Sequence, residues 1–69
     1  MNTNHYVDDL KFRIYQLATQ TNEASMMIQL YLHEEDYKQV QVWEKVGDEL
    51  IAELETLLFI YTTLYVKQD

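Results

Sequence analysis

The densest group of residues that could do chemistry is a set of carboxylates in the second half of the chain. It comprises Glu44, Asp48, Glu49, Glu53 and Glu55. On a helix, Glu44 with Asp48 and Glu49 with Glu53 are like-charge pairs four residues apart, which slightly destabilise an ordinary surface. Such carboxylates can keep an apolar assembly soluble, or they can bind a basic protein surface in the place of phosphate groups.

Residues of other catalytic and metal-binding motifs are missing from the sequence. The chain has no cysteine, and therefore no disulfide, thiolate metal site or thiol nucleophile. It contains no glycine-rich phosphate loop and no G-x-S-x-G or H-E-x-x-H motif. Neither His5 nor His33 follows a glutamate by three residues, as the ligands of di-iron helical bundles do. We therefore predict a protein that is not an enzyme and has no cofactor or metal.

One segment resembles a family of enzymes. EKVGDELIAELE, residues 44–55, resembles the all-α nucleotide pyrophosphohydrolases of the MazG type, which hold magnesium with Glu and Asp on bundle helices. Glu44 stands four residues before Asp48, where that family spaces the pair at three. Glu34 and Glu35 lack an acidic companion three residues on, and Lys38 stands there instead. A magnesium-dependent pyrophosphohydrolase fragment is therefore a remote alternative, and no residue roles are carried over.

Length and charge restrict the class of protein. A chain of 69 residues is one domain, 1–69, near the lower limit for independent folding, and without disulfides it needs oligomerisation as its extra source of stability. The formal net charge is −7, and the five Lys and Arg residues are scattered, so phosphate backbones should repel the chain. The longest apolar run, residues 57–61, is far shorter than the roughly 20 residues of a membrane span. We expect a cytoplasmic protein without direct nucleic-acid or membrane binding.

The pattern of apolar residues predicts two helices. There is no proline, and Gly47 is the single glycine. A seven-residue repeat predicts a helix over residues 4–32, with Asn4 as its N-cap. A turn over residues 33–36 follows, and Asp36 with Gln39 is typical of a capping box that begins a second helix over residues 37–66. The first repeat consists of Val7, Leu10, Ile14, Leu17, Thr21, Ala24, Ile28 and Tyr31, and the second of Val40, Trp43, Gly47, Leu50, Leu54, Leu57, Tyr61 and Leu64.

Two features of these repeats affect the expected helices: a polar stretch in the first and a glycine in the second. Residues 19–25, TQTNEAS, are polar and contain poor helix formers, so a break there would give three helices instead of two. The continuous helix is favoured because the repeat resumes in phase after this stretch. Antiparallel pairing places Gly47 opposite residues 21–24, so that small residues meet and the helices can approach closely.

Both helices carry more apolar residues than one seam can bury. We therefore expect an all-α antiparallel hairpin that forms a homodimeric four-helix bundle. It resembles Rop-type hairpins in length and layout, although the RNA binding of that family needs a basic face that this chain lacks. The residues assigned to the oligomer interface are Trp43, Leu50, Leu54, Leu57, Leu58, Tyr61 and Leu64.

The function that this sequence favours is binding to another protein without catalysis. Tyr31, Tyr37 and Trp43 are aromatic residues near the turn and form a candidate patch for that partner, since aromatic residues are common interface anchors. The alternative is an acidic inhibitor that mimics nucleic acid and occupies a nucleic-acid-binding protein through the five carboxylates of the second helix.

Overall fold

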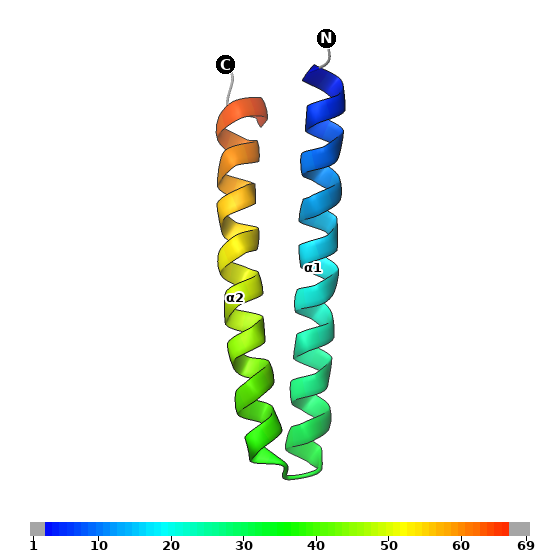
Figure 1. The fold of residues 1–69 in the computed structure, drawn as a ribbon, viewed down its shortest axis with the longest axis vertical. Coiled ribbons are helices and arrows are strands. Elements are labelled where there is room, and N and C mark those ends of the chain that lie inside the picture. Colours follow the sequence, from blue (N-terminus) through cyan, green and yellow to red (C-terminus); the bar gives the residue numbers. More distant parts are fainter. Residues whose placement is uncertain (1–2, 67–69) are drawn as a thin grey trace.

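The chain forms an antiparallel hairpin of two long α-helices (Figure 1). The computed structural model describes the backbone of residues 3–66 and the side chains of residues 6–64. Helix α1 spans Thr3–His33, helix α2 spans Tyr37–Tyr61, and a short π-helical segment, η1, continues over Thr62–Val66. The predicted all-α hairpin is confirmed.

Helix α1 is continuous, so the three-helix alternative is wrong. Residues 19–25 lie inside it, and only Thr21 and Ala24 of this stretch turn away from solvent. The Thr21 hydroxyl donates a hydrogen bond to the Leu17 carbonyl oxygen at 2.8 Å, which satisfies this polar group beside the seam. The helix begins at Thr3, so Asn4 is not its N-cap; the side chain of Asn4 lies outside those described.

The end of α1 is a Schellman motif. The Asp36 amide donates to the Tyr31 carbonyl at 2.9 Å, and the Glu35 amide donates to the Leu32 carbonyl at 3.1 Å. Glu35 has a φ of 59°, the left-handed conformation that this motif requires and that glycine usually supplies. The turn is therefore one residue shorter than predicted, since His33 still belongs to α1.

Half of the predicted capping box begins α2. The Gln39 amide donates to Asp36 Oδ1 at 3.3 Å, as expected of an N-cap. The reciprocal bond of a full capping box would use the Asp36 amide, and this group is already bonded to Tyr31.

The seven-residue repeats form the seam between the helices. Every residue of the first repeat is buried or half-buried, and so is every residue of the second as far as Tyr61. Leu64 departs from this pattern, with 48% of its surface exposed. It lies in η1, where the wider π-helical turn rotates side chains off the line of the α-helical repeat. The prediction of a regular α-helix to residue 66 is therefore wrong beyond Tyr61.

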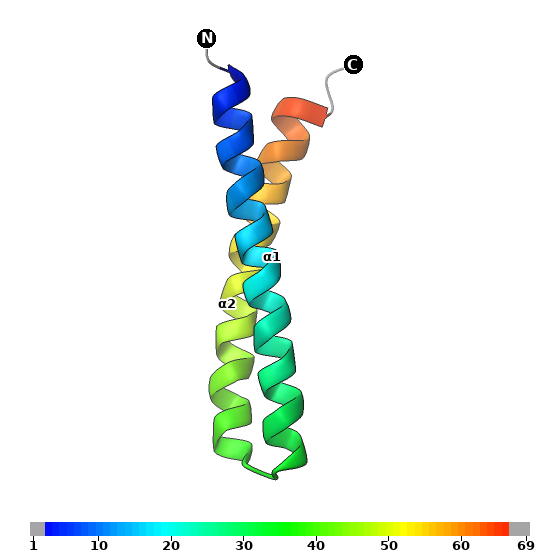
Figure 2. The same ribbon diagram turned by 90° about the vertical axis from the view of Figure 1, so that its right-hand side faces the viewer.

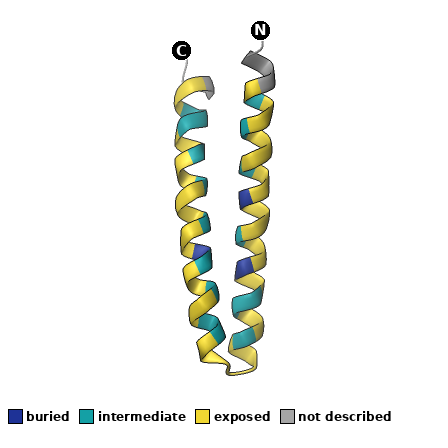
Figure 3. Ribbon diagram, viewed as in Figure 1, coloured by how far each residue is buried: buried dark blue, intermediate teal, exposed yellow. Residues whose placement is uncertain are grey.

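The hairpin is long and has very little interior. It measures 51 × 18 × 14 Å, and Figure 2 shows the helices crossing so that their free ends lie apart. Among the described side chains, the buried hydrophobic residues are Leu17 and Ala24, at 0% and 1% exposure. Gly47 is buried opposite them, and Figure 3 shows the remaining burial confined to the facing sides of the helices. An added Cβ at Gly47 would lie 3.8 Å from Ala24 Cβ, so the small residues meet as predicted.

Glu35→Gly should stabilise the hairpin, because glycine adopts the left-handed conformation without the strain that a Cβ imposes, roughly 1 kcal/mol. For a domain of this size, that free energy corresponds to an increase in Tm of roughly 4–8 °C in thermal unfolding. Glu35→Gln is the matched control, since it removes the charge but keeps the Cβ. A Tm of the glycine variant at or below that of the glutamine variant would contradict the argument.

Gly47→Ala should also stabilise the protein, since a methyl group fits in ordinary van der Waals contact with Ala24. Alanine is favoured over glycine inside a helix by about 1 kcal/mol. Ala24→Gly, across the seam, should lower the free energy of unfolding by at least that amount. Urea unfolding of both variants at one protein concentration measures the two effects; destabilisation by Gly47→Ala would show that this site has less space than the structure indicates.

Candidate functional site

The most prominent surface feature is the amount of apolar side chain left open to solvent. Twelve large hydrophobic residues among the described side chains are exposed by 41–72%. They are Tyr6, Phe12, Tyr15, Met26, Leu30, Leu32, Tyr37, Val42, Ile51, Leu58, Phe59 and Leu64. Where exposed apolar side chains gather into a patch on a soluble protein, the patch marks an interaction site.

The residues beside the seam divide the hairpin into two flanks, which we name after one member of each. The Ile51 flank consists of Lys11, Ala18, Ser25 and Leu32 on α1, with Tyr37, Glu44, Ile51 and Leu58 on α2. The Arg13 flank consists of Tyr6, Arg13, Gln20 and Met27 on α1, with Gln39, Val46, Glu53 and Ile60 on α2. Each set recurs every seven residues, immediately next to the seam positions.

The Ile51 flank contains two grooves between the helices. The first, of about 220 Å³, lies over the small residues of the seam and is lined by Ala24, Ser25, Gly47 and Ile51 among others. The second, of about 270 Å³, lies nearer the free ends and is lined by Lys11, Ile14, Tyr15, Leu58 and Tyr61. Lys11 Nζ lies 6.0 Å from the centroid of the Tyr61 ring, at the outer limit of a cation–π contact.

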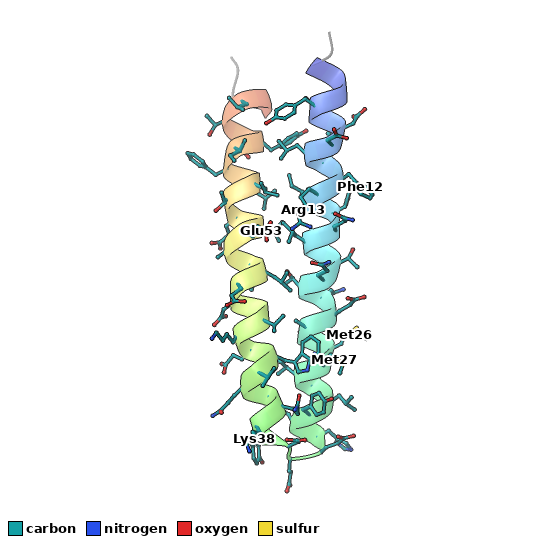
Figure 4. All side chains as sticks on the ribbon, viewed as in Figure 1. Phe12, Arg13, Met26, Met27, Lys38 and Glu53 are labelled. Atoms are coloured by element: carbon teal, nitrogen blue, oxygen red, sulfur yellow. The ribbon has the colours of Figure 1, made fainter. Side chains whose placement is uncertain are left out.

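The Arg13 flank is crossed by an ion pair. Arg13 Nη2 donates a hydrogen bond to Glu53 Oε2 at 2.8 Å, and the side chains are 45% and 48% exposed. Figure 4 shows Arg13 and Glu53 reaching toward each other between the helices. A pair this exposed contributes only about 0–1 kcal/mol to stability. It nevertheless engages the carboxylate of Glu53, a candidate partner-binding residue.

Trp43 shares a groove of about 350 Å³ with Met26, Met27 and Glu23 on the Arg13 side of the hairpin. The other predicted members of its aromatic patch lie elsewhere: Tyr31 is half-buried in the seam, and Tyr37 is 59% exposed on the Ile51 flank. Sequence reasoning did not place the methionines with Trp43. The sequence did contain this information. The predicted pairing of Gly47 with Ala24 also places Trp43 level with Ile28, and Met27 is the residue next to Ile28.

The five candidate carboxylates of α2 are exposed but do not share one face. Seven-residue spacing places Glu44, Asp48 and Glu55 on the side of Ile51, while Glu49 and Glu53 lie on the side of Arg13. Within the part of the chain that the structure describes, no group of three or more His, Asp and Glu residues could hold a metal ion. His33 is exposed at the end of α1, and the side chain of His5 is outside those described.

The predicted oligomer-interface residues fall into two groups. Five of them pack half-buried against α1 inside the hairpin, and the other two are exposed. The half-buried group is Trp43, Leu50, Leu54, Leu57 and Tyr61, and the exposed group is Leu58 and Leu64, at 42% and 48%. Half-burial leaves part of each seam residue open at the flanks of the hairpin.

Comparison of the chain with protein-family models, with curated proteins and with solved structures gives no match in any of the three. In residues 3–66, neither helix has a stretch of sufficient length and hydropathy to span a bilayer.

Proposed function

We propose that this chain is a small cytoplasmic interaction protein that dimerises into a four-helix bundle and acts by binding another protein, without catalysis. The observation that supports this most strongly is the imbalance between interior and surface. Leu17 and Ala24 are the buried hydrophobic residues of the described chain, against twelve large hydrophobic residues that stay exposed. Burying each of those side chains against a partner is favourable by roughly 1.5–3 kcal/mol, so association is a strong source of stability.

The surface area supports association of two copies. The chain exposes 5460 Å². A compact monomer of its mass, 8.3 kDa, would expose roughly 4,600 Å². The difference between the exposed area of this chain and that of the compact monomer is close to the roughly 800 Å² that each partner buries in a standard protein–protein interface.

The groove around Trp43 suits a second, different protein. Trp is the residue type most enriched among interface anchors, and methionine side chains adapt to varied apolar surfaces. Met26 and Met27 lie beside Trp43 in this groove. The acidic-inhibitor alternative has weaker support, because the α2 carboxylates lie on two sides of the helix and Arg13 already pairs with Glu53. In the proposed function these carboxylates keep an apolar assembly soluble.

Sedimentation equilibrium should give a mass of twice 8.3 kDa at micromolar concentration and a lower average mass on dilution. Because dimerisation stabilises the folded chain, Tm should also rise with protein concentration. A monomer at every concentration, with a Tm that does not change, would overturn the proposed dimer.

Trp43→Ala should weaken binding to the outside partner by roughly 30-fold or more, the effect typical of an interface anchor. The partner is first captured from a lysate of the source organism and identified by mass spectrometry, and its affinity is then measured at low and high salt. Phe59→Ala is the matched control, since Phe59 is an exposed aromatic residue of α2 outside both flanks. If the affinity instead falls with salt and with amide replacement of Glu44, Asp48 and Glu49, the acidic-inhibitor function is correct.

A further inference from the structure

We infer that a second copy of the chain docks on the Ile51 flank with its turn at the same end, so that each α1 packs against the partner's α2. This inference rests on the proposed dimer and specifies its geometry. It has two parts, the choice of flank and the choice of orientation, and each part depends on separate observations.

The distribution of exposed apolar surface favours the Ile51 flank. On this side of the seam lie five of the twelve exposed large hydrophobic residues: Tyr15, Leu32, Tyr37, Ile51 and Leu58. The Arg13 side has four, which are Tyr6, Met26, Leu30 and Val42. The two grooves over the seam also open on the Ile51 flank, where side chains of a second copy can enter them.

The ion pair disfavours docking on the opposite flank. Arg13 and Glu53 are half-exposed at 45% and 48% and lie across the middle of that side. A second copy placed there would remove both charged groups from water, and the cost of that desolvation can exceed the attraction between them. On the Ile51 flank, Lys11 can lay its aliphatic chain on apolar surface and keep its ammonium group in water.

Charge decides the orientation. Two twofold arrangements bring the Ile51 flanks together. With the turns at opposite ends, α2 packs against the partner's α2; with the turns at the same end, α2 packs against the partner's α1.

The net charges of the two helices differ. Between Thr3 and His33, α1 has two basic and three acidic residues, a net charge of −1. Between Tyr37 and Tyr61, α2 has two basic and five acidic residues, a net charge of −3. Pairing α2 with the partner's α1 therefore places a net charge of −3 beside one of −1. Pairing α2 with α2 would place two net charges of −3 side by side, which gives stronger repulsion.

The carboxylates nearest to the docking surface strengthen this choice. Glu44, Asp48 and Glu55 all lie on the Ile51 side of α2, so pairing α2 with α2 would bring six carboxylates together. The same-end arrangement does gather the acidic residues of the two turns, Glu34, Glu35 and Asp36. They are exposed at the tip of the hairpin, where water and salt screen their repulsion.

Side-chain size also fits the same-end dimer. Ala18 on α1 and Ile51 on α2 lie at nearly the same level along the hairpin, since Ala24 and Gly47 are level with each other. A twofold axis parallel to the helices preserves these levels, so Ile51 of each copy meets the small Ala18 of the other. Ser25 and Glu44 line the same groove. In the same-end dimer, Ser25 of one copy therefore lies near the level of Glu44 of the other.

Electron spin–spin distances test the orientation, because the chain has no cysteine and one can be introduced and labelled at a single site. A nitroxide at Glu34→Cys marks the turn. Turns at the same end should give a distance of roughly 30 Å or less, from helices packed 8–10 Å apart. Turns at opposite ends should give a distance of more than roughly 40 Å, since the hairpin is 51 Å long. A long distance would overturn the orientation while leaving the proposed dimer intact; no dipolar signal, together with a monomeric mass in sedimentation, would overturn the dimer itself.

Thiol reactivity tests the flank with conservative changes. Ser25→Cys, on the Ile51 flank, should react with a water-soluble thiol reagent at least roughly ten times more slowly in the dimer than after dilution to monomer. Gln20→Cys, on the Arg13 flank, is the matched control and should react at the same rate in both states. Circular dichroism checks that each variant stays helical. Protection of Gln20→Cys, or equal reactivity of the two thiols in the dimer, would overturn the choice of flank.

Discussion

The structure depends on a geometric constraint: a helix with one neighbour can bury only the side chains that face that neighbour. In this hairpin the facing side chains belong to the two seven-residue repeats, and among the described side chains burial is complete only around Leu17, Ala24 and Gly47. The other described apolar residues of both helices are half-buried or exposed. The thin core and the large exposed surface are therefore two consequences of one constraint, and the proposed association would cover surface that the hairpin cannot cover itself.

Two local features make the flanks of the seam different. Small residues at Ala24 and Gly47 leave a groove on the Ile51 flank, because neither side chain extends far enough to fill it. On the other flank the long side chains of Arg13 and Glu53 meet across the seam. A hairpin with two equivalent flanks could stack copies on both sides without limit. Unequal flanks favour closure of the proposed dimer, because docking on the Arg13 flank would take the Arg13–Glu53 ion pair out of water.

Much of the fold could be predicted from the sequence, because the seven-residue repeats alone identify the seam and Asp36 marks the start of α2. The left-handed Glu35 could not be predicted, since glycine is the usual residue in that conformation and no glycine stands there. The π-helical conformation of η1, Thr62–Val66, could not be predicted either, because Leu64 continues the seven-residue repeat in sequence. Two contacts between the helices could be predicted only from the register in which the helices pair. They are the contact of Arg13 with Glu53 and that of Trp43 with the methionines. The level at which Gly47 meets Ala24 indicates that register, but only once α1 is known to be one unbroken helix.

The geometry of the proposed dimer has a consequence for binding. Docking through the Ile51 flank leaves the Arg13 flank of both copies open, and with it both grooves around Trp43. One dimer then presents two identical binding sites. A partner that carries two copies of its own motif would bind far more tightly than either site alone, provided that its spacing matches the dimer. With both turns at the same end the two grooves lie at the same level along the bundle, whereas turns at opposite ends would separate them along its axis. The orientation of the dimer therefore sets the spacing that a bivalent partner must match.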